Sequence, residues 1–123
     1  MRKNQQPLDR KHYPAGEPVF KEVDEGRHAY FVETGEVQIK RQAEDGDERV
    51  LGTVGQGDIF GEMALIDDQP RMASVYASKE ATLILIARDS FRKRLEKFDP
   101  LIKTLLAIFV KNIRALTAAK TSP

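Results

Sequence analysis

The chain has no cysteine and no tryptophan, and it contains only two histidines, His12 and His28. Without cysteine it can form no disulfide scaffold, no thiolate metal site and no cysteine nucleophile. Two histidines cannot supply a three-histidine metal centre or a histidine-rich two-metal hydrolytic cluster. The sequence offers no catalytic constellation, and we expect a protein that is not an enzyme.

Long apolar runs are also missing. The longest cover residues 83–87 and 105–110, which is far below the ~20 residues that span a bilayer. Residues 1–6 lack the apolar stretch of a secretory signal. We therefore expect a soluble, cytoplasmic protein without a membrane span. A length of 123 residues, of which 41% are hydrophobic, suits one domain.

The net charge of +1 combines two halves of opposite sign. Residues 1–87 carry a net charge of −5, and residues 88–123 carry +6. A basic tail can meet phosphate or an acidic partner, or it can be the solvated face of a helix. No aromatic stripe accompanies the basic residues and no groove-reading helix is apparent. We favour the solvated face and do not expect a nucleic-acid partner.

Two hydrophobic periods divide the chain near Ala87. Before it, short segments rich in Val, Ile, Phe, Tyr and Thr alternate with glycine-containing turns, a pattern typical of a barrel, sandwich or jelly roll. Residues 83–86 are apolar on both faces, which predicts a central strand. The predicted strands cover residues 18–23, 29–33, 36–40, 49–54, 74–78 and 82–87.

After Ala87 the period becomes helical. Asp89 can cap a first helix, and Asp99-Pro100 provides an N-cap and a first helical residue for a second helix over residues 100–119. Apolar side chains follow that second helix in two stripes, too wide for a single seam. One stripe can pack on the β domain while the other meets a ligand or a partner chain. Core packing of both stripes is equally compatible with the pattern.

The most informative segment covers residues 57–75. Gly61 permits a close backbone approach, and residues 62–65 can form a helical turn whose free amides suit an anion. The guanidinium of Arg71 can bind two anionic oxygens, whereas Glu62 is suited to accept hydrogen bonds from hydroxyl groups. A nucleotide has both a phosphate and hydroxyl groups. The alternative is a Glu62–Arg71 ion pair that closes an ordinary loop.

Both halves of this segment resemble the phosphate-binding cassette of cyclic nucleotide-binding domains. They read Phe60-Gly61-Glu62-Met63-Ala64-Leu65 and Pro70-Arg71-Met72-Ala73-Ser74-Val75. The family includes regulatory subunits of cAMP-dependent protein kinase, cyclic-nucleotide-gated channels and bacterial catabolite activators. The resemblance covers roughly residues 12–118, including a glycine turn at Thr34-Gly35 that separates two strands.

The resemblance implies a mainly β fold with C-terminal helices: an eight-stranded, jelly-roll-like β-roll followed by two α-helices. We expect a flexible segment over residues 1–11 and the binding domain over residues 12–119. Within it, the β-roll covers residues 12–87 and the helices cover 88–119. Family members usually have a helix ahead of the β-roll, for which this sequence leaves little room.

The resemblance also implies roles for individual residues. Arg71 would bind the exocyclic oxygens of a cyclic phosphate, and Glu62 with the backbone of Gly61 would bind the ribose 2′-hydroxyl. Met72 stands where members that prefer cGMP often have a threonine, so we expect cAMP rather than cGMP, as a regulatory ligand and not a cofactor. The amides of Ala64 and Met72 would complete the phosphate cradle, Ala73 would keep the wall narrow, and Val54, Met63, Leu65 and Val75 would line the base side.

We expect a sensor in which ligand binding draws the C-terminal helix over the base as a lid. The candidate lid residues are Phe109, Asn112 and Ile113. The sensor would act on a protein partner, or as a homodimer through the last helix. The alternatives are a β-roll interaction module that binds no ligand, and a fragment of a larger regulator such as a transcription factor or a channel.

Overall fold

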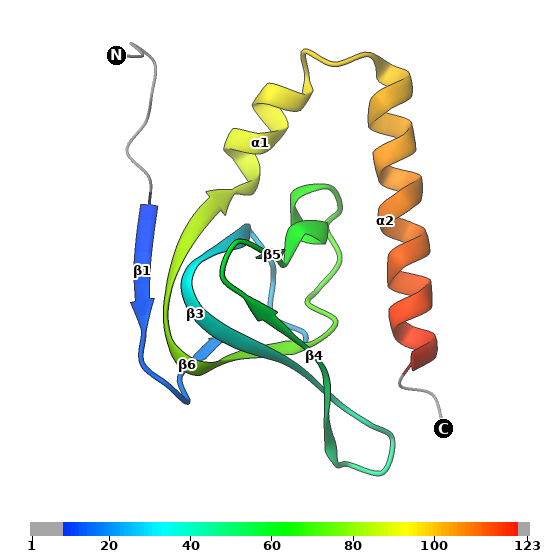
Figure 1. Cartoon of the computed structure of the whole chain (residues 1–123). Helices are drawn as coiled ribbons and strands as arrows, with labels where there is room; N and C mark the ends of the chain where they lie inside the picture. Colours follow the sequence, from blue (N-terminus) through cyan, green and yellow to red (C-terminus); the bar gives the residue numbers. More distant parts are fainter. Residues whose placement is uncertain (1–8, 121–123) are drawn as a thin grey trace.

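The computed structural model describes residues 9–120, which form one sheet and two C-terminal α-helices (Figure 1). A short 3₁₀ helix, η1, lies between β5 and β6. The strands are β1 (Asp9–Tyr13), β2 (Pro18–Phe20), β3 (His28–Gln42), β4 (Glu48–Gly55), β5 (Ile59–Phe60) and β6 (Ser74–Ala87). The helices are η1 (Glu62–Leu65), α1 (Arg88–Leu95) and α2 (Pro100–Lys120).

All strand pairs are antiparallel, and the main sheet order is β1-β6-β3-β4. The two shortest strands lie off this path, with β2 paired to β6 and β5 paired to β3. The expected class, a β-roll followed by two helices, is confirmed. Residues 9–120 contain six strands rather than the eight that the resemblance implied, because β3 and β6 each continue through a bend.

The bend in β3 lies at Gly35. The sequence predicted a turn there that separates two strands, but the strand is continuous and only its register with β6 shifts. Gly35 has a φ of 90°, and a Cβ at this position would lie 2.2 Å from the carbonyl oxygen of Glu80. Only glycine fits this left-handed backbone against β6. The bulge therefore bends two long strands together without ending their pairing.

The core lies between the two arms of the bent sheet. Its fully buried members include Val32, Val37, Val75 and Leu83, and burying each such side chain contributes about 1.5–3 kcal/mol. The rings of Tyr30 and Phe60 stack beside them with centroids 5.1 Å apart. Strand β6 lies between β1 and β3, which confirms the prediction that its apolar second half is central.

Strand β1 was not predicted, because four of its five residues are exposed and polar and only Tyr13 is buried. It pairs with the second half of β6 from Asp9 onward. Residues 9–11 therefore belong to the sheet and not to the expected flexible segment. Residues 1–8 of that segment lie outside the described residues.

The helices match their predicted ranges closely. A backbone amide of α2, that of Leu101, donates to the Asp99 carboxylate over 2.7 Å, which confirms Asp99 as the N-cap. Asp89 is not a cap: α1 begins one residue earlier, after an extended Ala87, and Asp89 lies in its first turn. None of the helices in residues 9–120 is long and apolar enough to cross a membrane.

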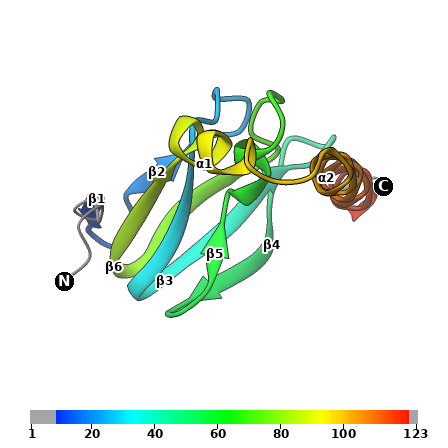
Figure 2. The ribbon, with the colours of Figure 1, turned by 90° about the horizontal axis from the view of Figure 1, so that it is seen from above.

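Helix α2 lies at the opposite side of the molecule from β1 (Figure 2). Among its described side chains only Val110 is buried, at 8% exposure. Most of the apolar residues in its two stripes are exposed, so core packing does not account for both. The exposed large apolar side chains of α2 are Leu101, Ile102, Leu105, Ile108, Phe109, Ile113 and Leu116.

Candidate ligand-binding site

The site begins where β5 ends. Gly61 has a φ of 71°, in the left-handed region, and this turn starts the η1 helix at Glu62. The helical turn predicted over residues 62–65 is therefore present. Its amides are less free than expected, because the Ala64 N–H donates to the Gly61 carbonyl over 3.2 Å. The turn directs Glu62 outward and buries Ala64 and Leu65.

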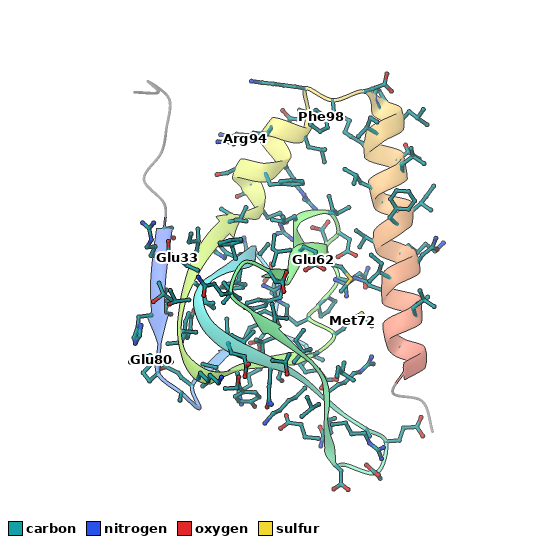
Figure 3. The ribbon with its side chains drawn as sticks, viewed as in Figure 1. Glu33, Glu62, Met72, Glu80, Arg94 and Phe98 are labelled. Carbon is teal, nitrogen blue, oxygen red and sulfur yellow. The ribbon has the colours of Figure 1, made fainter. Side chains whose placement is uncertain are left out.

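A cavity of about 270 Å³ lies beside this turn. Seven of the eight predicted binding residues line it: Gly61, Glu62, Met63, Ala64, Arg71, Met72 and Ala73. The eighth, Leu65, is buried but is not part of the lining. In Figure 3, Glu62 and Met72 lie between the sheet and α2, where the cavity wall continues onto that helix.

Arg71 is the central cation of the site, and its side chain is almost fully buried, with 8% exposure. Its Nη1 donates to the Gly61 carbonyl over 3.2 Å and its Nη2 to the His28 carbonyl over 2.7 Å. Its guanidinium lies 3.9 Å from the ring centroid of Phe20, in a cation–π contact. These contacts fix the guanidinium in one position at the cavity wall.

Within residues 9–120, Arg71 forms no ion pair with a carboxylate. Among the residues that the structure describes, Glu62 forms no ion pair with Arg71, and the buried Nε of Arg71 has no hydrogen-bond partner. Burial lowers the pKa of Arg71, and the positive charge of Arg114 lowers it further. Against this burial, the Tyr30 hydroxyl and the negative charge of Asp24 act to raise the pKa. A buried cation with an unused donor favours an anionic ligand.

The opposite wall of the cavity is apolar. It consists of side chains from β3, β4 and β5, together with Val75 of β6. Two of the four residues expected on the base side, Val54 and Val75, are here, and Met63 lines the cavity from η1. Sequence reasoning missed the other members of this wall, since their pairing across β3 and β4 depends on the register of the sheet. They are Ile39, Leu51, Ile59 and Phe60.

Helix α2 contributes Ile113 and Arg114 to the cavity wall. Ile113 was a predicted lid residue. The other two, Phe109 and Asn112, are exposed and do not line the cavity in this structure. Arg114 was not predicted, because the register of a helix against a pocket is not readable from sequence. Its position directly after a predicted lid residue was the only available signal.

Arg114 pairs with Asp67, a residue of the loop between η1 and β6. Its Nε and Nη2 lie 2.7 and 2.9 Å from the two carboxylate oxygens. The Asp67 side chain is only 25% exposed, whereas that of Asp68 is 74% exposed. Asp68 is also paired, with Arg88 at 3.0 Å and Arg92 at 3.2 Å.

The family model of the cyclic nucleotide-binding domain matches residues 10–98, which include the whole cassette and both bent strands. The chain belongs to the cyclic nucleotide-binding domain family. The domain is 32% identical over 107 residues to the cyclic AMP receptor protein of Thermus thermophilus, covering 87% of this chain and 50% of that protein. It is 38% identical over 96 residues to a cAMP-dependent protein kinase regulatory subunit of Emericella nidulans, covering 78% and 23% of the two chains.

Solved structures agree with the assignment. The cAMP-bound form of the EAL enzyme Bd1971 matches the domain with a TM-score of 0.83 at 32% identity, over 91% of this chain and 30% of that one. The Thermus thermophilus catabolite activator protein matches with a TM-score of 0.71 at 31% identity, over 92% and 52%. The chain spans half the length of the Thermus thermophilus receptor protein, 23% of the kinase regulatory subunit and 30% of the EAL enzyme chain. It therefore corresponds to the binding domain of these larger proteins.

Proposed function

We propose that the domain binds cAMP in the 270 Å³ cavity and that binding regulates a protein partner through α2. The observation that carries this proposal is Arg71. It is buried and held by two backbone carbonyls and a ring, it forms no ion pair within residues 9–120, and its Nε has no hydrogen-bond partner there. A cyclic phosphate supplies both the negative charge and the acceptor oxygens.

The proposed contacts divide the ligand between the two walls. Arg71 holds the exocyclic phosphate oxygens. The Glu62 carboxylate accepts a hydrogen bond from the ribose 2′-hydroxyl, which the Gly61 backbone also contacts. The Met72 amide supports the phosphate beside Ala73. The Ala64 amide can join it only by leaving the Gly61 carbonyl, to which it donates over 3.2 Å.

The base would lie against the apolar wall. Its side chains offer apolar surface to a purine but no hydroxyl group. The thioether of Met72 is only a weak acceptor for the guanine amino group, to which a threonine hydroxyl could offer a strong one. These features favour cAMP over cGMP. For the EAL enzyme Bd1971, structures with either cyclic nucleotide are known, so cGMP is included in the test below.

Helix α2 is the proposed lid, and Ile113 is its contact with the cavity. Phe109 and Asn112 can reach a ligand only if α2 turns or shifts from the position seen here. The ligand favours the closed position of α2 only if the closed state binds the ligand more tightly than the open state does.

Titration calorimetry with cAMP and cGMP tests the proposal. The unmodified chain should bind cAMP, and Arg71→Ala should weaken binding at least about 30-fold, because it removes a buried charge from its partner. Glu62 is exposed, so Glu62→Gln keeps the fold and should weaken binding about tenfold. Arg49→Ala is the matched control, because it removes an arginine from an exposed pair with Asp45 away from the cavity. Absence of binding by the unmodified chain would refute the proposal.

A second function, assembly through α2, is favoured by the exposed apolar side chains of that helix. The proposed partner is a second copy of the chain, which would cover both stripes at once. Sedimentation velocity should then show a dimer that Ile108→Lys converts to a monomer without loss of the fold. If the chain is monomeric and binds no cyclic nucleotide, neither function stands.

The proposal gives the domain a regulatory role and not a catalytic one, as is typical of this family. Relatives in Mycobacterium tuberculosis are named as cAMP-activated transcriptional regulators, of which this chain covers about half. For the whole protein, the absence of a nucleic-acid partner and the cytoplasmic location remain predictions.

A further inference from the structure

The loop of residues 66–70 follows η1 and is tied to both C-terminal helices. Asp67 holds Arg114 of α2 through two short contacts, and Arg114 also donates to the Pro70 carbonyl over 3.3 Å. Asp68 holds α1 through Arg88 and Arg92. The adjacent carboxylates of Asp67 and Asp68 therefore pair with different helices, Asp67 with α2 and Asp68 with α1.

The Asp67–Arg114 pair is well placed to fix α2. It is bidentate, and its side chains are only 25% and 14% exposed, so solvent screens it less than a surface pair. Helix α2 has one buried described side chain, Val110, and one partly buried leucine, Leu106, while its other large apolar residues are exposed. Because α2 has so little apolar packing, the Asp67–Arg114 ion pair contributes a large share of the free energy that favours one position of this helix.

We propose that Asp67 is a positioning residue that holds α2 across the cavity through Arg114. Arg114 follows Ile113 directly, so fixing its guanidinium also fixes the Ile113 side chain at the cavity wall. A ligand that contacts Ile113 then meets a helix already in place, and its affinity depends on the pair. The affinity part of this inference rests on the proposed function, whereas the position of α2 does not.

The first test measures α2 without ligand. In Asp67→Asn the side-chain oxygen can still accept the Gln69 amide, now at 3.2 Å, but the charge that holds Arg114 is lost. Hydrogen exchange of the α2 amides should become faster in Asp67→Asn, and Asp67→Glu should largely restore the slow exchange. Asp45→Asn, which breaks the exposed pair with Arg49, is the control and should leave α2 unchanged. Equal α2 exchange in Asp67→Asn and the unmodified chain would overturn the inference.

The second test is a double-mutant cycle on cAMP affinity. Asp67→Asn and Arg114→Gln should each weaken binding by about fivefold, and the double variant should be no weaker than either, because both remove one interaction. Additive losses would show that Arg114 contacts the ligand independently of Asp67, and would contradict the proposed role. Asp68→Asn breaks the contacts of the loop with α1 but not with α2. It should leave α2 exchange unchanged if Asp67, and not the loop in general, positions α2.

The two proposals fail differently. If the unmodified chain binds no cyclic nucleotide, the proposed function fails, and the exchange measurement alone decides whether Asp67 positions α2. If the unmodified chain binds cAMP while Asp67→Asn changes neither affinity nor α2 exchange, the function stands and the positioning role is wrong. Because the chain has no cysteine, one cysteine introduced on α2 and one on β4 can each carry a label. The distance between the two labels then also reports the position of α2 relative to the sheet.

Discussion

Arg71 shows how one side chain can be held ready for a ligand. Desolvating a guanidinium is costly, and the structure offsets this with two carbonyl acceptors and the face of Phe20. Carbonyls and rings compensate a cation without neutralising it, so the positive charge remains available at the cavity. Glu62, on the adjacent turn, is exposed and lines the same cavity, and it forms no ion pair with Arg71 in the described structure.

Gly35 gives a prediction at the same scale. Gly35→Ala places a Cβ 2.2 Å from the Glu80 oxygen and 2.6 Å from the Ala81 Cα, on a backbone with positive φ. We expect a loss of about 3 kcal/mol in the free energy of unfolding, measured by urea denaturation. Gly46→Ala has the same φ of 90° but no neighbouring atom within 4 Å, and should cost about 1 kcal/mol. Equal losses in both variants would contradict the steric explanation.

At the scale of elements, the sheet and α2 are stabilised differently. The sheet buries its side chains between two bent arms, whereas α2 packs little and depends on its own ends and on Arg114. The position of α2 is therefore the part of the fold most easily changed by a ligand, a partner or a substitution.

The N-cap of α2 makes this testable. Asp99→Ala removes the acceptor of the Leu101 amide, 2.7 Å away, and should destabilise the helix by about 1 kcal/mol. Far-ultraviolet circular dichroism should show less helix while the unfolding of the sheet is little changed. The control is Asp89→Ala in α1, where Asp89 is not the cap and a smaller loss is expected. An unchanged helix signal in Asp99→Ala would argue against capping.

At the scale of the whole molecule, polar contacts join segments far apart in the chain. Strand β1 lies at the edge of the sheet, and its Arg10 reaches across β6 to Glu33 of β3 through contacts of 2.9–3.1 Å. The hydrogen bond from Arg10 lowers the pKa of Glu33 below its ordinary value of 4.5, and the charge of Arg10 acts in the same direction. The ionised form of Glu33 therefore stabilises the folded state.

This predicts a pH dependence. Because the pKa of Glu33 is lower in the folded state, its contribution is present above pH 4.5 and is lost as the pH falls through the folded-state pKa. Glu33→Gln should melt at a slightly lower temperature than the unmodified chain near neutral pH, since the pair is exposed. The difference should vanish in strong acid. A difference that persists in acid would assign the effect to packing rather than charge.

The sequence alone determined the class of the fold, because that depends on local patterns, and its resemblance to a known family implied most of the cavity lining. Alternating apolar residues specify strands, Asp99-Pro100 starts a helix, and the cassette residues lie within one short segment that folds back on itself. Only the tertiary structure decided that Gly35 bends a strand instead of ending it, and that Phe20 lies under Arg71. It also decided that Asp67 holds Arg114, since residues 47 positions apart meet only once α2 has a fixed place beside the cavity.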